Sequence, residues 1–288
     1  MTIGIIGLGI MGGAYGRNLM AAGEAVIGVD PNPTARDRFT AAGGRAEATL
    51  GPWIAECEMV ILSLISPAVL AEVSQNLAGF LQPGQIVLET GTFAMADKLA
   101  AKANIEAGGG VLLDCPISGT GAQAAVGDLV MMASGPSDAV ARVQPILSKF
   151  TRSVIEAGEF GAGIKLKYVA NHAVALHNAA AAEVLHYADA LELDRDIVYT
   201  LLKSGAGQSR MLDLRMPLMI SGDYDPPTAS LKMFEKDLSV IGADIARLGV
   251  DAPMLDVVTK LYQTASEMLP ETYDTAAVFE VYREGKAN

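Results

Sequence analysis

Residues 3–12 read IGIIGLGIMG, and this stretch decides the architecture of the first half of the chain. The run Ile3–Ile6 is short, apolar and rich in β-branched residues, which is the pattern of a buried strand. Gly7, Gly9 and Gly12 follow it in the spacing G-x-G-x-x-G, and the residues after Gly12 have a helical period. A strand, a glycine turn and a helix in this order predict the first unit of a dinucleotide-binding Rossmann domain.

The glycine turn predicts a site for the pyrophosphate of a dinucleotide. Gly7 permits the tight turn, Gly9 lets backbone N–H groups approach the phosphates, and Gly12 allows the helix to pack closely on the strand. The helix N-terminus then faces the phosphates with the positive end of its dipole. Glycine-rich turns also occur without nucleotides, but the position of this one at the start of the chain favours a cofactor. We expect the intervening residues to contact the cofactor as well: Leu8, Ile10 and Met11.

The end of the second predicted strand favours NAD over NADP. Asp30 closes this strand 18 residues after Gly12, where a carboxylate can accept hydrogen bonds from the adenosine ribose hydroxyls. The same negative charge repels a 2′-phosphate. The segment Pro31–Pro33 contains no arginine, and Arg36 and Arg38 lie a helical turn or more further along the chain. We therefore expect NAD, with NADP as the less favoured cofactor.

Up to about residue 155, short β-branched runs alternate with alanine-rich stretches of helical period. This alternation is typical of βαβ units around a parallel sheet, so the first domain is predicted to be α/β. The predicted strands are Ile3–Ile6, Ala25–Val29, Met59–Leu64, Ile86–Glu89, Val111–Cys115, Leu129–Ala133 and Ser153–Glu156.

The rest of the chain is predicted to be helical. A segment without glycine or proline runs from Ile164 to Leu191 and predicts one helix on the order of 40 Å long, which joins the two domains. Three glycines in the segment 157–163 mark the boundary. We expect a cofactor domain over residues 1–160 and an all-helical domain for substrate binding and oligomerisation over residues 161–288. The other predicted helices are 195–202, 209–220, 231–248 and 253–268.

The composition is that of a globular protein with an excess of acidic residues. Of the 288 residues, 51% are hydrophobic and 19% are charged, and no apolar run approaches the roughly 20 residues that span a bilayer. The formal net charge of −12 argues against nucleic acid and anionic membranes as partners, because both require a basic surface. Residues 1–10 lack the basic start of a signal peptide, and Cys57 and Cys115 alone cannot make a disulfide framework. We expect a cytoplasmic protein.

The long predicted helix carries the residues best suited to acid–base chemistry. Lys167 and Asn171 are one turn apart, and Asn178 and Asp189 lie on the same stripe of the helix. A lysine desolvated beside a cofactor has a lowered pKa and can exchange a proton with an alcohol or carbonyl oxygen near neutral pH. The alternative is a lysine that extends its ammonium group from an apolar helix into solvent. The spacing of the three histidines does not suit a metal, so none is expected.

A second cluster of polar residues lies in segment 114–121, DCPISGTG, at the carboxyl end of a predicted strand. Open α/β sheets bind ligands at this end of their strands. The Ser118 hydroxyl and the successive backbone N–H groups after it are suited to hold a carboxylate. The alternative is a simple turn between a strand and a loop.

With these residues in view, the chain resembles a known family over essentially its whole length. It is similar to the β-hydroxyacid dehydrogenases that include 3-hydroxyisobutyrate dehydrogenase and 6-phosphogluconate dehydrogenase. Four ordered motifs carry the resemblance: GLGIMG at 7–12, DCPISGTG at 114–121, GAGIKLKYVANH at 161–172 and KDL at 236–238. The second of these motifs is similar to the family's D-x-P-x-S-G-G substrate signature, and the third is similar to its G-x-G-x-x-x-K-x-x-x-N catalytic signature.

The resemblance implies an NAD-dependent oxidoreductase with a defined set of site residues. It implies that Lys167 is the general acid/base and that Asn171 hydrogen-bonds the substrate hydroxyl. It also implies that Ser118 and Gly119 hold the substrate carboxylate, with Thr120 in the same loop. Further positions match those that contact the cofactor in the family: Leu64, Ile65, Thr92 and Lys236.

Departures from the family pattern affect the substrate rather than the reaction. Thr120 stands where the family has a second glycine, Gly91 stands where it has a serine, and the region near Ala229 lacks a bulky aromatic residue. The segment Ser204–Tyr224 is similar to sugar-acid members such as threonate dehydrogenases. We expect hydride transfer between NAD(H) and a small β-hydroxy acid, either 3-hydroxyisobutyrate-like or a sugar acid such as threonate or glycerate. Contacts to extra hydroxyls have three candidates: Ser209, Arg210 and Arg215. The alternative for both arginines is a role at the surface or at a helix end.

Two alternative functions remain at this point. One is a reductase of imines or aldehydes on the same scaffold, and the other is a non-catalytic nucleotide-binding protein. The presence of Lys167 argues against the second. The long apolar helices also predict more hydrophobic surface than one chain covers, so we expect a homodimer or homotetramer.

Overall fold

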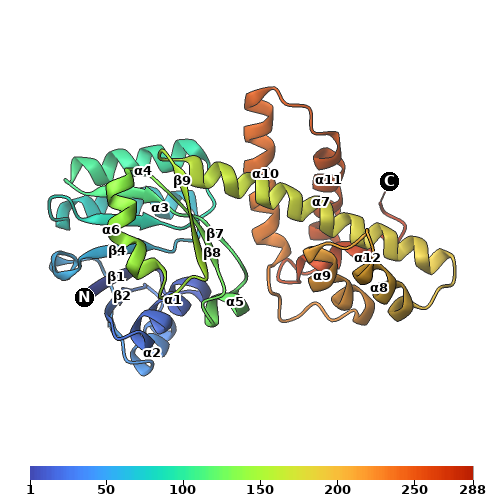
Figure 1. Ribbon diagram of the computed structural model, residues 1–288, viewed down its shortest axis with the longest axis horizontal. Coiled ribbons are helices and arrows are strands. Elements are labelled where there is room, and N and C mark those ends of the chain that lie inside the picture. Colours follow the sequence, from blue (N-terminus) through green and yellow to red (C-terminus); the bar gives the residue numbers. More distant parts are fainter. Residues whose placement is uncertain (288) are drawn as a thin grey trace. The chain divides into compact units, whose positions relative to one another are not determined.

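The computed structural model describes residues 1–287, which form two units: Met1–Lys167, and the chain from Tyr168 onward. The first unit is a Rossmann-like domain on a mostly parallel sheet, and the second is helical (Figure 1). The predicted fold class is therefore confirmed. No helix within the described residues is both long and apolar enough to cross a membrane.

The first unit is built on one nine-stranded sheet. The strands are β1 (Thr2–Ile6), β2 (Ala25–Val29), β3 (Arg45–Glu47), β4 (Met59–Leu62), β5 (Ile86–Glu89), β6 (Val111–Asp114), β7 (Ile117–Ser118), β8 (Val130–Ser134) and β9 (Ser153–Gly158). Their order is β3-β2-β1-β4-β5-β6-β8-β7, with β9 beside β8. Strands β1 to β6 are parallel, whereas β8 runs antiparallel to β6 and β7. The order reverses between β1 and β4, which is the point where open α/β sheets bind ligands.

Helices cover both faces of this sheet (Figure 1). They are α1 (Ile10–Ala21), α2 (Pro33–Ala41), α3 (Pro67–Leu77), α4 (Met95–Ala107), α5 (Gly121–Ala125) and α6 (Ser137–Leu147). Side chains alternate along each strand: Met59 and Ile61 pack with α1, α2 and α6, whereas Val60 and Leu62 pack with α3 and α4. Strands buried on both faces explain why these runs are continuously apolar in the sequence.

All seven predicted strands are present, with ends that shift by at most two residues. The predicted strand Met59–Leu64 ends at Leu62, because the chain then turns across the edge of the sheet and passes against Gly7. A methyl group on Gly7 would lie 2.2 Å from the Ser63 carbonyl oxygen. The two strands that were not predicted, β3 and β7, are three and two residues long.

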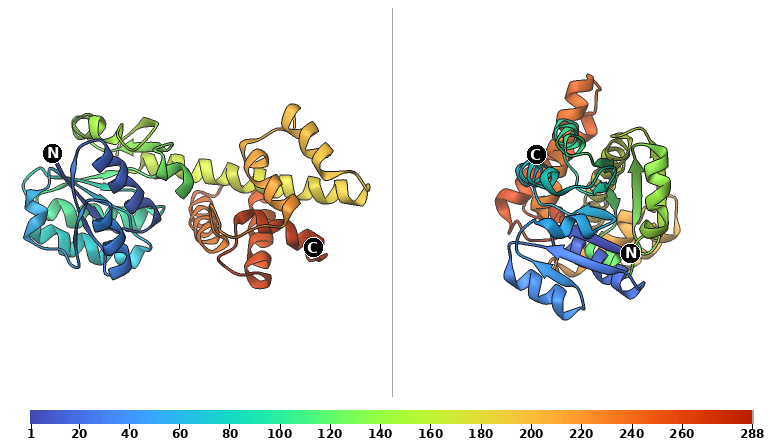
Figure 2. Two further views of the ribbon diagram at one scale, coloured as in Figure 1. Left: turned by 90° about the horizontal axis from the view of Figure 1, so that it is seen from below. Right: turned by 90° about the vertical axis from the view of Figure 1, so that its left-hand side faces the viewer.

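The helical unit is grouped around the long helix α7 (Ala162–Ala190), as Figure 2 shows. The other helices are α8 (Arg195–Ser204), α9 (Arg210–Ser221), α10 (Leu231–Leu248), α11 (Pro253–Met268) and α12 (Phe279–Arg283). The bounds of α10 and α11 are those predicted from the sequence. The two units divide after Lys167, within α7.

Candidate active site

The glycine turn between β1 and α1 has the close contacts that its sequence requires. Gly7 has φ +94°, and a methyl group on Gly12 would lie 1.9 Å from the Gly7 carbonyl oxygen. Nothing lies within 4 Å of the position where Gly9 would carry a methyl group, so this side of the turn is open. No side chain caps α1 at Gly9, which leaves backbone N–H groups at the helix start for a ligand. The turn therefore fits a dinucleotide pyrophosphate.

Asp30 is fixed at the end of β2 by two backbone donors. The Leu8 N–H donates to Asp30 Oδ2 at 2.8 Å, and the Asn32 N–H donates to Oδ1 at 2.8 Å. Each carboxylate oxygen has a second lone pair and can still accept a ribose hydroxyl. Because Leu8 belongs to the glycine turn, the same contact joins the predicted ribose and pyrophosphate sites.

Arg36 lies closer to Asp30 than we predicted. Its Nη1 donates to the Asp30 carbonyl oxygen at 2.7 Å and to the Pro31 carbonyl oxygen at 2.9 Å. The expectation that no arginine lies beside Asp30 is wrong, because the Arg36 side chain reaches back from the first turn of α2 to the backbone at Asp30. A guanidinium group therefore stands beside the backbone that carries the Asp30 carboxylate.

Large apolar side chains are exposed at the same edge of the sheet. Ile10 is 74% exposed at the start of α1, and Ile65 is 85% exposed three residues after β4. Ile10 follows β1 and Ile65 follows β4, and these two strands are neighbours at the point where the strand order reverses. Leu64 packs against the core instead. The exposed side chains are suited to contact the flat rings of a cofactor, as predicted for Ile10 and Ile65.

The predicted substrate loop lies next to the glycine turn. A methyl group on Gly121 would lie 2.6 Å from Ile10 Cγ2. Ser118 pairs with Val130 of β8 and is half-buried. Gly119 has φ +145°, and a methyl group there would lie 2.4 Å from a Leu129 methyl carbon, so the loop requires glycine at this position.

Thr120 has a structural role that was not predicted from the sequence. Its hydroxyl accepts a hydrogen bond from the Gln123 N–H at 3.5 Å, and Gln123 Oε1 accepts one from the Thr120 N–H at 3.0 Å. This reciprocal pair is a capping box at the start of α5. The threonine thus supports the loop by capping the helix that follows it.

Helix α7 presents the two residues expected to act on the substrate. Lys167 is half-buried, and Asn171 follows one turn later and is buried. In the helical unit, Asn171 Nδ2 donates to Asp237 Oδ2 at 2.8 Å. Asp237 also forms an ion pair with Lys236, with Nζ 3.0 Å from Oδ1. The carboxylate thereby holds the Asn171 amide in one orientation.

This contact of Asp237 was not predicted from the sequence, where the residue belongs to the KDL motif. A signal for it exists in the helical period of α10. Phe234, Leu238 and Ile241 are buried, and Asp237 lies on the same buried face. A charged residue on an apolar helix face requires a polar partner.

Other candidate residues have structural contacts in the helical unit. Arg215 is buried and forms an ion pair with Asp274 at 3.0 Å, so its predicted contact to a substrate hydroxyl has no support. Ser209 caps α9 by accepting the Leu212 N–H at 3.0 Å. Asn178 is fully buried and donates to the Thr275 carbonyl oxygen at 3.1 Å.

The cysteines are not suited to nucleophilic catalysis. Both thiols are buried and free. Burial raises the pKa of Cys57 to about 12 and raises the pKa of Cys115 as well. Since the thiolate is the reactive form, both side chains are inert at neutral pH.

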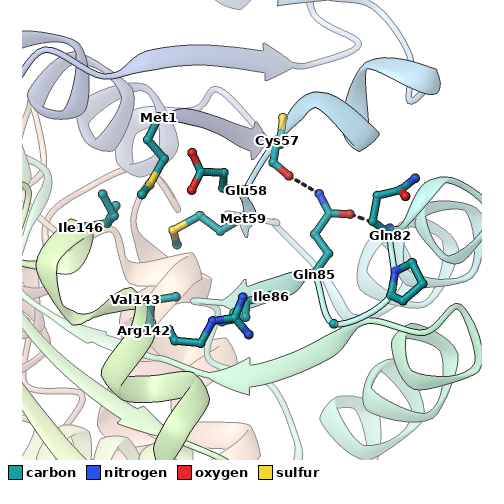
Figure 3. Close-up of a pocket in the computed structure, with 12 residues that line it drawn as sticks. Met1, Cys57, Glu58, Met59, Gln82, Gln85, Ile86, Arg142, Val143 and Ile146 are labelled. Atoms are coloured by element: carbon teal, nitrogen blue, oxygen red, sulfur yellow. Dashed lines mark hydrogen bonds between the residues drawn. The ribbon is translucent and has the colours of Figure 1, made fainter.

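A hollow of about 360 Å³ lies elsewhere in the first unit (Figure 3). Met59 and Ile86 line it, and each is the first residue of its strand, so the hollow is at the amino edge of the sheet. Gln85 spans part of this region by donating to the Cys57 carbonyl oxygen at 2.6 Å and accepting the Gln82 N–H at 2.9 Å. Parallel sheets bind ligands at the opposite, carboxyl edge, where the glycine turn lies.

Two family profiles match most of the chain. The NAD binding domain of 6-phosphogluconate dehydrogenase matches residues 2–158, and the NAD-binding domain of NADP-dependent 3-hydroxyisobutyrate dehydrogenase matches residues 161–282. L-threonate dehydrogenase of Cupriavidus necator is 30% identical over 286 residues, which cover 98% of this chain and 96% of that protein.

Solved structures agree with these profiles. The 3-hydroxyisobutyrate dehydrogenase of Mycobacterium tuberculosis, determined with L-serine, is 26% identical with a TM-score of 0.90, covering 98% of this chain and 99% of that one. An imine reductase of Streptomyces aurantiacus is 21% identical with a TM-score of 0.64 over 98% and 99% of the two chains, a likeness of fold alone. The chain therefore belongs to the β-hydroxyacid dehydrogenase family of 6-phosphogluconate and 3-hydroxyisobutyrate dehydrogenases, and it is an NAD-dependent hydroxy-acid dehydrogenase.

Proposed function

We propose that this dehydrogenase acts on a small sugar acid such as threonate, with Lys167 as the general acid/base. One observation carries the assignment of the site: the Ser118–Thr120 loop adjoins the open side of the turn at Gly9, through the contact of Gly121 with Ile10. A carboxylate held by this loop would lie beside a cofactor held by the turn.

The proposed chemistry uses residues from three segments. Bound nicotinamide supplies the hydride acceptor in the oxidative direction. Neutral Lys167 accepts the hydroxyl proton of the substrate, and in reduction its ammonium group returns that proton. Asn171, oriented by Asp237, hydrogen-bonds the hydroxyl. Ser118 and the backbone of Gly119 hold the carboxylate, and this fixed orientation supplies much of the rate.

The proposed cofactor site follows the carboxyl edge of the sheet. NAD is the preferred cofactor because Asp30 presents a carboxylate to the ribose, while Arg36 beside it allows weaker binding of NADP. The complete proposed set of contacts is Gly7, Leu8, Gly9, Ile10, Met11, Gly12, Asp30, Leu64, Ile65, Thr92 and Lys236.

The substrate assignment rests on similarity along the whole chain. The L-threonate dehydrogenase of Cupriavidus necator is 30% identical over 98% of this chain. The second candidate is 3-hydroxyisobutyrate, because the solved M. tuberculosis enzyme of that name has a TM-score of 0.90. The small Ala229, where the family often has a bulky aromatic residue, favours the larger sugar acid.

A coupled assay tests both parts of this proposal. NADH formation is followed with threonate, glycerate, serine and 3-hydroxyisobutyrate, first with the native chain and then with Lys167→Ala. We expect the highest kcat/KM with threonate and a loss of about 10²–10⁴-fold in kcat for Lys167→Ala, the usual contribution of a general acid or base. NADH binding, measured by fluorescence, should persist in this variant. Near-native turnover by Lys167→Ala would overturn the catalytic role.

We further propose that residues 1–160 bind the cofactor and residues 161–288 complete the substrate site and form a homodimer or homotetramer in the cytoplasm. Support for assembly comes from large apolar side chains that are exposed on the helical unit. Ile197 and Leu201, one turn apart on α8, are each 70% exposed. Met254 and Val257 of α11 are 66% and 58% exposed.

A further inference from the structure

Three ionisable side chains are buried together at the carboxyl edge of the sheet. Glu89 ends β5 and Asp114 ends β6, and they are register partners on these neighbouring strands. Lys98, in the first turn of α4, forms an ion pair with Glu89 and places its Nζ 2.7 Å from Asp114 Oδ1. The exposed fractions are 1% for Glu89 and 0% for Lys98 and Asp114. The chemistry proposed above uses none of the three.

The charges in this cluster depend on one another. Burial raises the pKa of Glu89, an effect that the ammonium group of Lys98 opposes. Burial alone would lower the pKa of Lys98, but the two neighbouring carboxylates raise it. Lys98 is therefore charged, and its ammonium group offsets part of the cost of burying two acidic side chains next to each other.

On one side of the cluster, Glu89 holds the loop that carries Thr92. Glu89 Oε1 accepts the Gly91 N–H at 2.6 Å. A methyl group on Gly91 would lie 2.2 Å from a ring carbon of Phe93 and 2.7 Å from Glu89 Oε1. The Glu89 carboxylate and the Phe93 ring thus occupy the space that a side chain at position 91 would need. This explains why glycine stands where the family has serine.

On the other side, Asp114 holds the first turn of α7. Its Oδ2 accepts the Ile164 N–H at 2.8 Å, three residues before Lys167. The Ser134 hydroxyl donates to the same oxygen at 3.1 Å and accepts the Gly163 N–H at 3.0 Å. A methyl group on Gly163 would lie 2.8 Å from the Asp114 carbonyl oxygen, so the helix begins in direct contact with the strand end.

Stability alone does not account for this arrangement. A buried ion cluster is often no more stabilising than apolar side chains of the same volume, because each charge loses its hydration. Apolar side chains, however, cannot accept the N–H groups of Gly91 and Ile164. A carboxylate can, and it then needs Lys98 as its counter-ion.

We propose that Glu89, Lys98 and Asp114 are positioning residues, which hold the Thr92 loop and the first turn of α7 in one fixed relation. Lys98 joins the two carboxylates across neighbouring strands, so neither segment shifts without the other. The cluster thereby sets the position of Lys167 relative to the nicotinamide end of the cofactor site. This inference rests on the roles proposed above for Thr92 and Lys167.

Matched pairs of variants separate positioning from simple stability. Glu89→Gln and Glu89→Met have similar volumes and no charge, but only the glutamine keeps an acceptor for the Gly91 N–H. Asp114→Asn and Asp114→Leu make the same comparison at Asp114, because only the asparagine keeps an acceptor for the Ile164 N–H. Leu77→Ala, a fully buried position on α3, is the control for lost stability without a change at the site. Each variant is measured for thermal unfolding, NADH binding, kcat, KM and the primary deuterium isotope effect on kcat.

We expect Glu89→Met and Asp114→Leu to lower kcat on the order of 100-fold, the size of effect that a misplaced reacting group produces. The isotope effect on kcat should rise, since hydride transfer becomes rate-limiting, while the acceptor-keeping variants stay within about tenfold of native kcat. Leu77→Ala should lose thermal stability with little change in kcat. Equal kcat within each matched pair, or losses no greater than in Leu77→Ala at equal thermal stability, would overturn the inference.

Two further measurements keep the inference testable. Where a methionine or leucine variant does not fold, the double variant Lys98→Met with Glu89→Gln replaces it. It keeps both hydrogen-bond acceptors and removes the bridging ammonium group together with the charge of Glu89. A lowered kcat with a raised isotope effect supports positioning, and native values overturn it. Lys167→Ala is assayed in parallel: if it is inactive while the matched pairs do not differ, only this inference fails. If Lys167→Ala is active, the proposed function fails, and with it the part of this inference that concerns Lys167. A difference in kcat within the Glu89 pair would then support only the positioning of the Thr92 loop.

Discussion

Asp30 shows how one residue can serve both the turn and the cofactor. Its carboxylate accepts backbone N–H groups from Leu8 and Asn32, and it also stands at the end of β2 where the ribose is expected. Arg36 donates to the carbonyl oxygen of the same residue. We therefore expect the preference between NAD and NADP to depend on the balance between one carboxylate and one guanidinium group.

We predict that Asp30→Asn lowers kcat/KM with NAD by about 10- to 100-fold, because hydrogen bonds to a charged group contribute roughly 1.5–3 kcal/mol. The loss of negative charge should at the same time raise kcat/KM with NADP. Steady-state kinetics with both cofactors check this. Adding Arg36→Ala to Asp30→Asn should remove the gain with NADP. A native enzyme that prefers NADP would contradict the role of Asp30.

At the scale of elements, α10 supports α7 within the helical unit. Asp237 of α10 accepts the Asn171 amide, and both side chains are buried. Further along α7, Asn178 donates to the Thr275 carbonyl oxygen, so the polar stripe includes both the residues proposed to act on the substrate and a residue with a structural contact. One helix thus carries both kinds of residue.

We predict that Asp237→Leu lowers kcat by roughly tenfold or more and lowers the free energy of unfolding by about 1–3 kcal/mol, because a buried amide loses its acceptor. Asp237→Asn, which keeps an oxygen on the same side chain, should have the smaller effect on both quantities. Steady-state kinetics and chemical denaturation measure the two effects. Equal kcat in the two variants would show that Asp237 does not orient Asn171.

At the scale of the whole molecule, exposed apolar surface on the helical unit predicts assembly. Ile197 and Leu201 share one face of α8, while Val198 between them is buried. A pair of this kind at i and i+4 forms a continuous apolar stripe. The formal net charge of −12 opposes non-specific association, so the burial of such stripes should occur between defined faces.

We predict that Ile197→Asp with Leu201→Asp converts the native oligomer to a smaller species, because two buried carboxylates without partners would oppose the interface. Light scattering after size-exclusion chromatography measures the mass. Leu99→Asp, at a position on α4 that is 50% exposed in the first unit, is the matched control and should leave the mass unchanged. A native protein that is monomeric at micromolar concentration would refute the proposed assembly.

Much of the fold could be predicted because its signals are local. The glycine spacing of residues 7–12 reflects backbone contacts a few residues apart, and the bounds of α10 and α11 follow from helical period and flanking residues. Strands β3 and β7 were not predicted, because two or three residues cannot show a period. The proposed site residues likewise came from motifs, and their roles await the experiments above.

The sequence by itself determined the fold class, the order of the two domains and the class of reaction, because glycine turns, periodicity and ordered motifs are all properties of neighbouring residues. Only the tertiary structure decided which distant residues meet. It joined Asn171 to Asp237, placed Arg36 beside Asp30, and enclosed Glu89, Lys98 and Asp114 in one buried cluster. Such contacts depend on how strands and helices pack. A local pattern can indicate that Asp237 needs a buried polar partner, but it does not identify that partner.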